Sequence, residues 1–198
     1  MRVTIFDYGA GNLHSLLKAV AQPGVDVRVE DDAARATRSD VLLLPGVGAF
    51  AQAAARLAPG RAAIRRAVER GLPIVGICLG MQLLFEESAE GAGIGLGLLP
   101  GRVERLRARR VPHIGWNSLE SDNRSRARRA LPHTVYFAHS YACRPHDPDC
   151  VDAWCTHETD RFAAMVCRGR VAGVQFHPEK SSRSGVRFLQ TLLRELRS

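Results

Sequence analysis

Apolar runs alternate with helix-like segments along the first half of the chain. Residues 40–46 form the clearest run, and a continuous apolar run of this length is expected of a strand buried on both faces. Residues 60–71 are amphipathic and rich in arginine, with Ile64 and Val68 in the apolar stripe and Gly71 as the predicted C-cap. The alternation predicts an α/β fold with a doubly wound, mostly parallel central sheet flanked by helices. Strands are predicted at residues 2–8, 25–29, 40–46 and 73–78, and helices at residues 13–20, 60–71 and 81–88.

The second half of the chain consists mostly of strand-like segments that are joined by turn-rich stretches. Only residues 184–196 have a helical pattern there, and we expect this last helix to begin near residues 182–184. We expect the strands to add antiparallel edge strands to the central sheet, within a single domain over residues 1–198. Residues 121–129 are expected to form a mobile surface loop. The predicted strands are residues 101–108, 112–119, 134–143, 152–157, 162–169 and 171–178.

Positive charge is in excess, with 28 lysines and arginines against 20 acidic residues and a formal net charge of +8. Lys18 and Lys180 are the only two lysines, and the other basic residues are arginines. The densest basic clusters, residues 105–110 and 124–129, carry no interleaved aromatic side chains that could stack on bases. The charge pattern therefore disfavours nucleic-acid binding.

The cysteine and histidine patterns limit the redox and metal chemistry of the chain. None of the five cysteines forms a CxxC pair, no run of about 20 apolar residues is present, and the N-terminus lacks a signal-peptide layout. We therefore expect a cytoplasmic protein with reduced thiols. His157-Glu158 lacks the second histidine that HExxH requires, so no metal site is predicted.

Cys78 is the strongest candidate for a reactive residue. It lies between Gly76 and Gly80, at the end of the predicted strand 73–78 and before the predicted helix 81–88. A strand, a tight turn with small neighbours and a helix form a nucleophile elbow, of which GxSxG is the serine version. A helix N-terminus favours the thiolate and can lower a cysteine pKa from ~8.5 to ~3.5–7.5. The alternative is a small buried residue at a strand–helix join, which is our expectation for the other four cysteines.

A cysteine nucleophile needs a base and a group that orients the base. His177 and Glu179 are two residues apart, and Pro178 between them biases His177 toward an extended conformation. Side chains two apart in an extended chain lie on one face, so both are expected to point the same way. Glu179 could then fix the tautomer of His177 and stabilise its charge. Alternatively, Glu179 merely begins the last helix as an acidic N-terminal residue.

Residues 44–50 supply a third candidate piece. Gly46 and Gly48 flank Val47 directly after a predicted buried strand. Backbone N–H groups here, together with that of Leu79 after the nucleophile, could bind an oxyanion. Without the other two pieces, an ordinary strand-to-helix turn would be the better interpretation.

The order of oxyanion loop, cysteine elbow and His-x-Glu resembles the class I glutamine amidotransferases, which use a Cys-His-Glu triad. Over a wider set of segments, the chain is similar to one branch of that family, the glutaminase subunits of imidazole glycerol phosphate synthase. The elbow and His-Pro-Glu are shared by the class, whereas the segments at residues 7–13, 112–117 and 177–181 are more specific. The matching segments are residues 7–13, 44–50, 76–88, 95–106, 111–117, 136–141 and 173–181.

The resemblance implies that Cys78 hydrolyses glutamine through a glutamyl thioester, without a cofactor. It further implies a heterodimer with a (β/α)8 cyclase subunit, which uses the ammonia on a phosphorylated ribulosyl intermediate in histidine biosynthesis. Asn12 and Lys180 are expected at the interface with this partner. The positions that match glutamine-holding residues of the family are Gln82, His139, Ser140 and Tyr141.

Three other interpretations remain open at this point. Gly9 and Gly11 before a helix, with Glu30 further on, partly mimic a dinucleotide-binding fingerprint, but the position of its third glycine is His14. The chain could instead be a noncatalytic amidotransferase-like module that only binds a partner. It could also be the amidotransferase subunit of another ammonia-using synthase.

Overall fold

A seven-stranded sheet forms the centre of the computed structural model, which describes residues 1–9, 13–121 and 130–197. Its strand order is β10-β11-β12-β4-β3-β1-β2, and the five strands from β12 to β2 are parallel, whereas β10 and β11 are antiparallel. The predicted mostly parallel sheet is therefore confirmed. The strands are β1 (Arg2–Phe6), β2 (Asp26–Glu30), β3 (Val41–Leu44), β4 (Ile74–Ile77), β10 (Val151–His157), β11 (Asp160–Arg168) and β12 (Val171–Val174).

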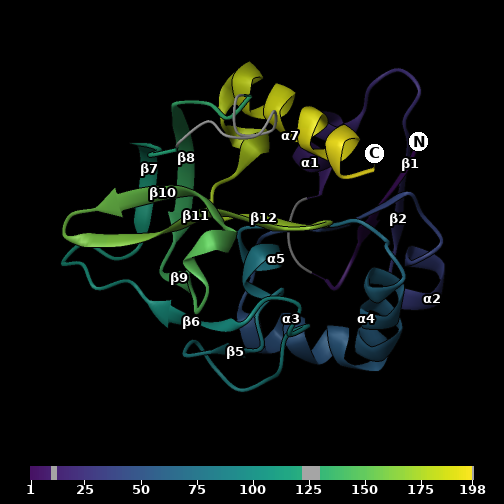
Figure 1. Cartoon of the computed structure of the whole chain (residues 1–198), viewed down its shortest axis with the longest axis horizontal. Coiled ribbons are helices and arrows are strands. Elements are labelled where there is room, and N and C mark those ends of the chain that lie inside the picture. Colours follow the sequence, from purple (N-terminus) through teal and green to yellow (C-terminus); the bar gives the residue numbers. More distant parts are fainter. Residues whose placement is uncertain (10–12, 122–129, 198) are drawn as a thin grey trace.

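Helices cover both faces of the sheet (Figure 1). All four residues of β3 are fully buried; Val41 and Leu43 pack into the core beneath α1 and α7, whereas Leu42 and Leu44 pack toward α2 to α5. A strand buried on both faces explains the continuous apolar run at this position. The helices are α1 (His14–Val20) and α7 (Ser182–Arg197) on one face, and α2 (Ala33–Ala36), α3 (Phe50–Leu57), α4 (Arg61–Glu69) and α5 (Leu79–Gln82) on the other.

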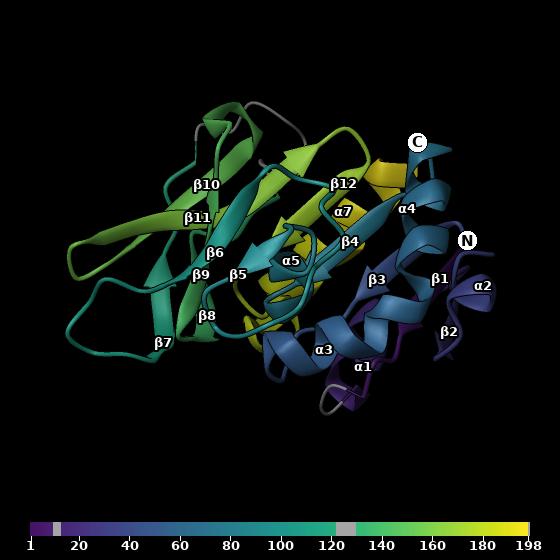
Figure 2. The same ribbon diagram turned by 90° about the horizontal axis from the view of Figure 1, so that it is seen from below.

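Two small sheets lie beside the antiparallel end of the central sheet (Figure 2). In the first, β6 pairs antiparallel with β9 and parallel with β5, and in the second β7 pairs antiparallel with β8. An ion pair of 2.6 Å between Arg144 Nη2 and Asp160 Oδ2 links β9 to β11. The elements are β5 (Glu87–Ser88), β6 (Gly101–Arg105), β7 (His113–Ser118), β8 (Thr134–His139) and β9 (Tyr141–Pro145), with 3₁₀ turns η1 (Ala58–Gly60), η2 (Pro148–Cys150) and η3 (Pro178–Lys180).

Several predicted elements were wrong in extent, among them the strand expected at residues 171–178, which ends at Val174. The helix expected at residues 81–88 is only α5, which ends at Gln82, because the chain then turns and residues 83–85 are buried on every side. The strand expected at residues 134–143 is two strands that separate at Ser140, since β8 pairs with β7 and β9 pairs with β6. Helices α2 and α3 were not anticipated. Most of the expected mobile loop, residues 122–129, lies outside the described residues.

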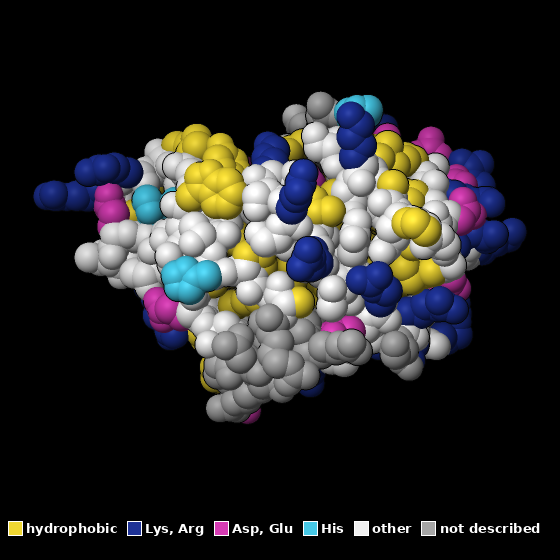
Figure 3. Space-filling model, turned by 90° about the horizontal axis from the view of Figure 1, so that it is seen from above, with side chains coloured by type: hydrophobic (Ala, Val, Ile, Leu, Met, Phe, Trp, Pro, Cys, Tyr) yellow, Lys and Arg dark blue, Asp and Glu magenta, His cyan; other side chains and the backbone are white. Residues whose placement is uncertain are grey.

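Basic side chains are scattered over the face covered by α1 and α7 (Figure 3). Helix α7 buries an apolar stripe and exposes Arg183, Arg187, Arg194 and Arg197 on its outer side. Within residues 1–9, 13–121 and 130–197, no helix is long and apolar enough to cross a membrane.

Candidate active site

Three adjacent strands of the sheet bring the candidate residues together. The order β12-β4-β3 places the segments after these strands side by side: His177 follows β12, Cys78 follows β4, and Gly46 follows β3. Ligands of open α/β sheets bind outside the carboxyl ends of the parallel strands, which is where these residues lie. The chain order of the motifs thus becomes a spatial cluster.

Cys78 lies on a sharp turn between β4 and α5. It has φ +50 and ψ −106, a positive φ that an L residue adopts only under constraint. The neighbouring glycines permit the turn, because a Cβ at Gly76 would collide with the backbone of Gly80, and one at Gly80 would collide with the carbonyl of Leu44. The pair of glycines is therefore a steric requirement of the elbow.

His177 and Glu179 form a buried pair next to Cys78. Nδ1 of His177 lies 2.8 Å from Oε1 of Glu179, and the side chains are only 2% and 10% exposed. His177 is extended, as expected, but Pro178 and Glu179 belong to η3, so the carboxylate reaches the imidazole across this turn. Burial lowers the pKa of His177, but interaction with Cys78 and then with Glu179 outweighs it and raises the pKa to about 10. The site therefore holds His177 as an imidazolium at neutral pH.

The loop after β3 is held against the elbow. The hydroxyl of buried Tyr8 donates a hydrogen bond to the carbonyl of Pro45, and a Cβ at Gly46 would collide with the carbonyl of Ile77. Gly48 has φ +124, which favours glycine. The N–H group of Leu79 is at the first position of α5, where helices leave N–H groups without an intrahelical acceptor. These backbone groups border the space in front of Cys78.

Neutral histidines support the segment at residues 139–141. Asn117 Oδ1 accepts from the N–H of Ser118, so its Nδ2 faces His113 Nε2 at 3.3 Å. His113 Nδ1 can then donate to His139 Nε2 at 3.1 Å, and His139 Nδ1 donates to the carbonyl of Tyr141 at 2.8 Å. Burial lowers the pKa of His113 to about 4 and that of His139 to about 3, so both stay neutral.

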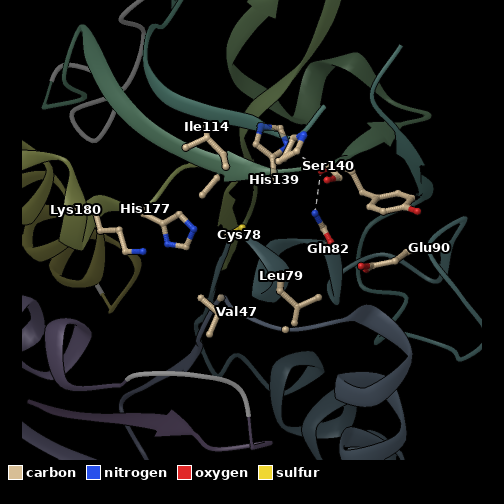
Figure 4. A pocket seen from close by; sticks show the side chains of 15 residues that line it. Val47, Cys78, Leu79, Gln82, Glu90, Ile114, His139, Ser140, His177 and Lys180 are labelled. Carbon is tan, nitrogen blue, oxygen red and sulfur yellow. Dashed lines mark hydrogen bonds between the residues drawn. The ribbon is translucent and has the colours of Figure 1, made fainter. Parts of the chain in front are cut away.

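A pocket of about 350 Å³ lies in front of Cys78 (Figure 4). It is lined by every candidate catalytic and substrate residue from the sequence except Glu179, which lies behind His177, and by Lys180 from the predicted interface. Asn12 lies outside the described residues. The lining residues are Gly46, Val47, Gly48, Cys78, Leu79, Gln82, Glu90, Pro112, Ile114, Ala138, His139, Ser140, Tyr141, His177 and Lys180.

Sequence reasoning missed several polar groups of this site. Glu90 lines the pocket across from His177, and its Oε2 accepts a hydrogen bond of 2.9 Å from the N–H of Phe50 at the start of α3. Gln175 is fully buried, with its Nε2 3.4 Å from Cys78 Sγ. Gln175 is within two residues of His177, which was a usable signal, whereas nothing in the sequence near Glu90 pointed to the pocket.

Comparison with known proteins agrees with this architecture. The model of the family "Glutamine amidotransferase class-I" matches residues 4–195. The imidazole glycerol phosphate synthase subunit HisH of Moorella thermoacetica is 46% identical over 95% of this chain and 92% of its own length, and that of Pyrococcus furiosus is 40% identical over 98% of both. A solved glutamine amidotransferase shares the fold with a TM-score of 0.77 and 20% identity over 98% of both chains. The chain belongs to the class-I glutamine amidotransferase family.

Proposed function

We propose that the chain is the glutaminase subunit of an imidazole glycerol phosphate synthase, and that it hydrolyses glutamine to glutamate and ammonia. One observation carries the chemical part of this proposal. Cys78 sits on a strained elbow in a pocket beside the buried His177–Glu179 pair, whose mutual distance of 2.8 Å fits a base and its orienting carboxylate. The partner and pathway are supported by relatives that carry the synthase subunit name.

In the first step, the thiolate of Cys78 attacks the side-chain amide carbon of glutamine. The carbonyl oxygen becomes an oxyanion, which we expect the backbone N–H of Leu79 and an N–H of the loop at residues 46–48 to stabilise, since both segments line the pocket. The C–N bond then breaks as His177 gives its proton to the leaving nitrogen. Ammonia leaves, and a glutamyl thioester remains on the sulfur.

In the second step, water replaces ammonia in the pocket. Neutral His177 takes a proton from this water, which attacks the thioester carbonyl. The tetrahedral intermediate collapses, the C–S bond breaks, and glutamate leaves while the thiolate of Cys78 is restored. Glu179 keeps Nδ1 of His177 protonated throughout, so that Nε2 remains the nitrogen that exchanges the proton.

The polar groups of the pocket suit the amino-acid end of glutamine. Glu90 offers a carboxylate to the α-ammonium group on the side of the pocket opposite His177 (Figure 4). Gln82 is fixed by its hydrogen bond of 3.0 Å to the carbonyl of Tyr141. Ser140 and Tyr141 line the same wall and complete the set of substrate-holding residues that we propose.

The mouth of the pocket supports docking of the cyclase. Val47 and Ile114 line the pocket and yet are 38% and 63% exposed, and Trp116, two residues along β7, is 55% exposed. Residues two apart on a strand share a face, so Ile114 and Trp116 form one apolar surface beside Lys180. A (β/α)8 subunit that covers this surface would receive ammonia directly from Cys78, in a heterodimer.

Replacing Cys78 tests this division of labour. Cys78→Ala should abolish glutamine hydrolysis, while the assembled synthase should still form imidazole glycerol phosphate and aminoimidazole carboxamide ribotide from the phosphorylated ribulosyl intermediate and added ammonium salt. Cys167→Ala is the control, because Cys167 lies on β11 and does not line the pocket. Glutaminase activity near the wild-type level in Cys78→Ala would remove Cys78 from the mechanism. Assays with other ammonia-using synthases would reveal a different partner.

A further inference from the structure

A fully buried glutamine, which does not line the pocket, faces the sulfur of Cys78. Gln175 directly follows β12, its side chain is fully buried, and its Nε2 lies 3.4 Å from Cys78 Sγ. The backbone holds both residues in register, because the N–H of Cys78 donates to the carbonyl of Val174 at 2.7 Å. The N–H of Gln175 itself donates to the carbonyl of Ala164 on β11 at 2.9 Å.

The surrounding hydrogen bonds fix which end of the Gln175 amide faces the sulfur. Gln82 must present its NH₂ group to the carbonyl of Tyr141, at 3.0 Å, because a carbonyl oxygen only accepts. The same NH₂ group lies 3.3 Å from Oε1 of Gln175. A flipped Gln175 would set two NH₂ groups against each other, so Oε1 faces Gln82 and Nε2 faces Cys78.

We propose that Gln175 is a catalytic residue of the glutaminase reaction, whose amide N–H donates a hydrogen bond to the thiolate of Cys78 and stabilises its negative charge. This proposal rests on the proposed function and assigns a new role within the same site. His177 and Gln175 then share the task. His177 moves the proton, whereas Gln175 provides a donor that never titrates and that the protein holds ready before glutamine arrives.

The competing explanation is that Gln175 only holds Gln82 in place. The two explanations differ in their pH dependence. Loss of a thiolate donor raises the pH at which the sulfur ionises, and so lowers reactivity at acid pH while sparing the alkaline plateau. Loss of a support for Gln82 would instead raise the KM for glutamine at every pH and leave the ionisation of Cys78 unchanged.

The test measures the alkylation rate of Cys78 by iodoacetamide across pH, followed by mass spectrometry of its peptide, in wild type and Gln175→Met. Methionine has a similar length and no donor. The acid limb of the profile should move upward by about one to two pH units, the equivalent of one hydrogen bond to a charged group. The acid limb of kcat/KM for glutamine should move in parallel, with about a tenfold loss on that limb per unit.

Two further variants serve as a control and as a substitute for Gln175→Met. Gln190→Met removes a comparable amide that donates to the carbonyl of Ala19 at 3.0 Å, away from the sulfur, and should leave both profiles unchanged. If Gln175→Met fails to fold, Gln175→Leu also lacks a donor and adds no charge, and it should also shift the acid limb upward. An unshifted limb in a folded Gln175 variant overturns the proposal.

The role of Gln175 and the proposed function can fail separately. A wild-type chain that releases no glutamate with its partner would remove the glutaminase assignment, while the alkylation profile would still report on the hydrogen bond. Alkylation profiles with the same acid limb in wild type and Gln175→Met would overturn the role of Gln175, whatever the glutaminase assay shows.

Discussion

At the scale of single residues, the backbone strain of the site is concentrated at Cys78. A non-glycine residue at φ +50 and ψ −106 costs about 1–3 kcal/mol, which the surrounding structure must offset. Its N–H donates to the carbonyl of Val174 at 2.7 Å, and its own carbonyl accepts from the N–H of Gln82 at 3.1 Å. The bond to Val174 belongs to the buried sheet, which explains how the strain persists. Because the backbone at the elbow is fixed and a cysteine side chain has only one torsion, the sulfur is directed toward the pocket.

The unequal roles of His177 and Glu179 can be separated by substitution. His177→Ala removes the proton carrier and should lower glutamine turnover by about 10²–10⁴-fold. Glu179→Gln keeps an acceptor for Nδ1–H and should stay partly active, because the orienting group affects only tautomer and charge. The raised pKa of about 10 keeps His177 protonated up to that pH in wild type, so loss of the carboxylate lets the proton leave at lower pH.

The pH profile of Glu179→Gln turnover and the imidazole NMR shifts of His177 would check this. The alkaline limb and the His177 titration should both move to lower pH, since the stabilising charge is gone. Ammonium-driven turnover by the complex serves as the control for folding. Equally mild effects of the two substitutions on glutamine turnover would indicate a structural role for the pair.

At the scale of elements, the sequence predicted the parallel core better than the connections between the strands and helices. The apolar run at residues 40–46 reads as a strand because both faces of β3 are covered. The predicted helix was longer than α5 because the apolar residues Leu83, Leu84 and Phe85 fit a helical pattern in the sequence. In the structure these residues lie in a turn, and their burial comes from tertiary packing. Glu90 could not be predicted, since its place in the pocket depends on a loop that folds back onto α3.

The loop after β3 is the element whose conformation we expect to control activity. Gly46 is packed against the backbone of Ile77 and cannot move freely, so rotation is left to the peptide between Val47 and Gly48. One such rotation could exchange a carbonyl for an N–H group at the oxyanion position. Since one oxyanion donor contributes about 10²–10³ in rate, this loop alone could keep the free chain a poor glutaminase until the partner binds.

Gly48→Ala tests the switch. Alanine narrows the range of φ open to residue 48, whose observed φ is +124, and so hinders the rotation between the two states; partner-stimulated turnover should fall by about 10²–10³-fold while glutamine binding and complex assembly persist. Gly169→Ala is the matched control, because Gly169 also has a positive φ, has open space for a Cβ, and lies in the turn between β11 and β12. Intact stimulation in Gly48→Ala, or a free chain as fast as the complex, would rule out the switch.

At the scale of the whole molecule, the pocket opens where the parallel sheet meets the small sheet of β7 and β8. Its rim combines exposed apolar groups, Val47 and Ile114, with the exposed cation of Lys180 (Figure 4). The backbone N–H of Lys180 donates to the carbonyl of His177 at 3.0 Å, so the lysine is fixed at its base, next to the proton carrier. A partner that covers this rim would bury the charged side chain of Lys180 near the route by which ammonia leaves Cys78.

Lys180→Ala should therefore impair the complex more than the fold. A charge that becomes buried and paired in an interface has a larger effect than one on an open surface, so we expect about a tenfold or greater loss in partner affinity or in ammonia transfer. Lys18→Ala is the matched control, because Lys18 is the other lysine, is exposed on α1, and does not line the pocket.

Titration of the cyclase and the ratio of product formed to glutamate released would measure affinity and coupling separately. Thermal unfolding of the free chain should change little in both variants, since exposed charges contribute at most about 1 kcal/mol to stability. An unchanged complex with full ammonia transfer in Lys180→Ala would remove this lysine from the interface, and the apolar rim would then have to account for docking by itself.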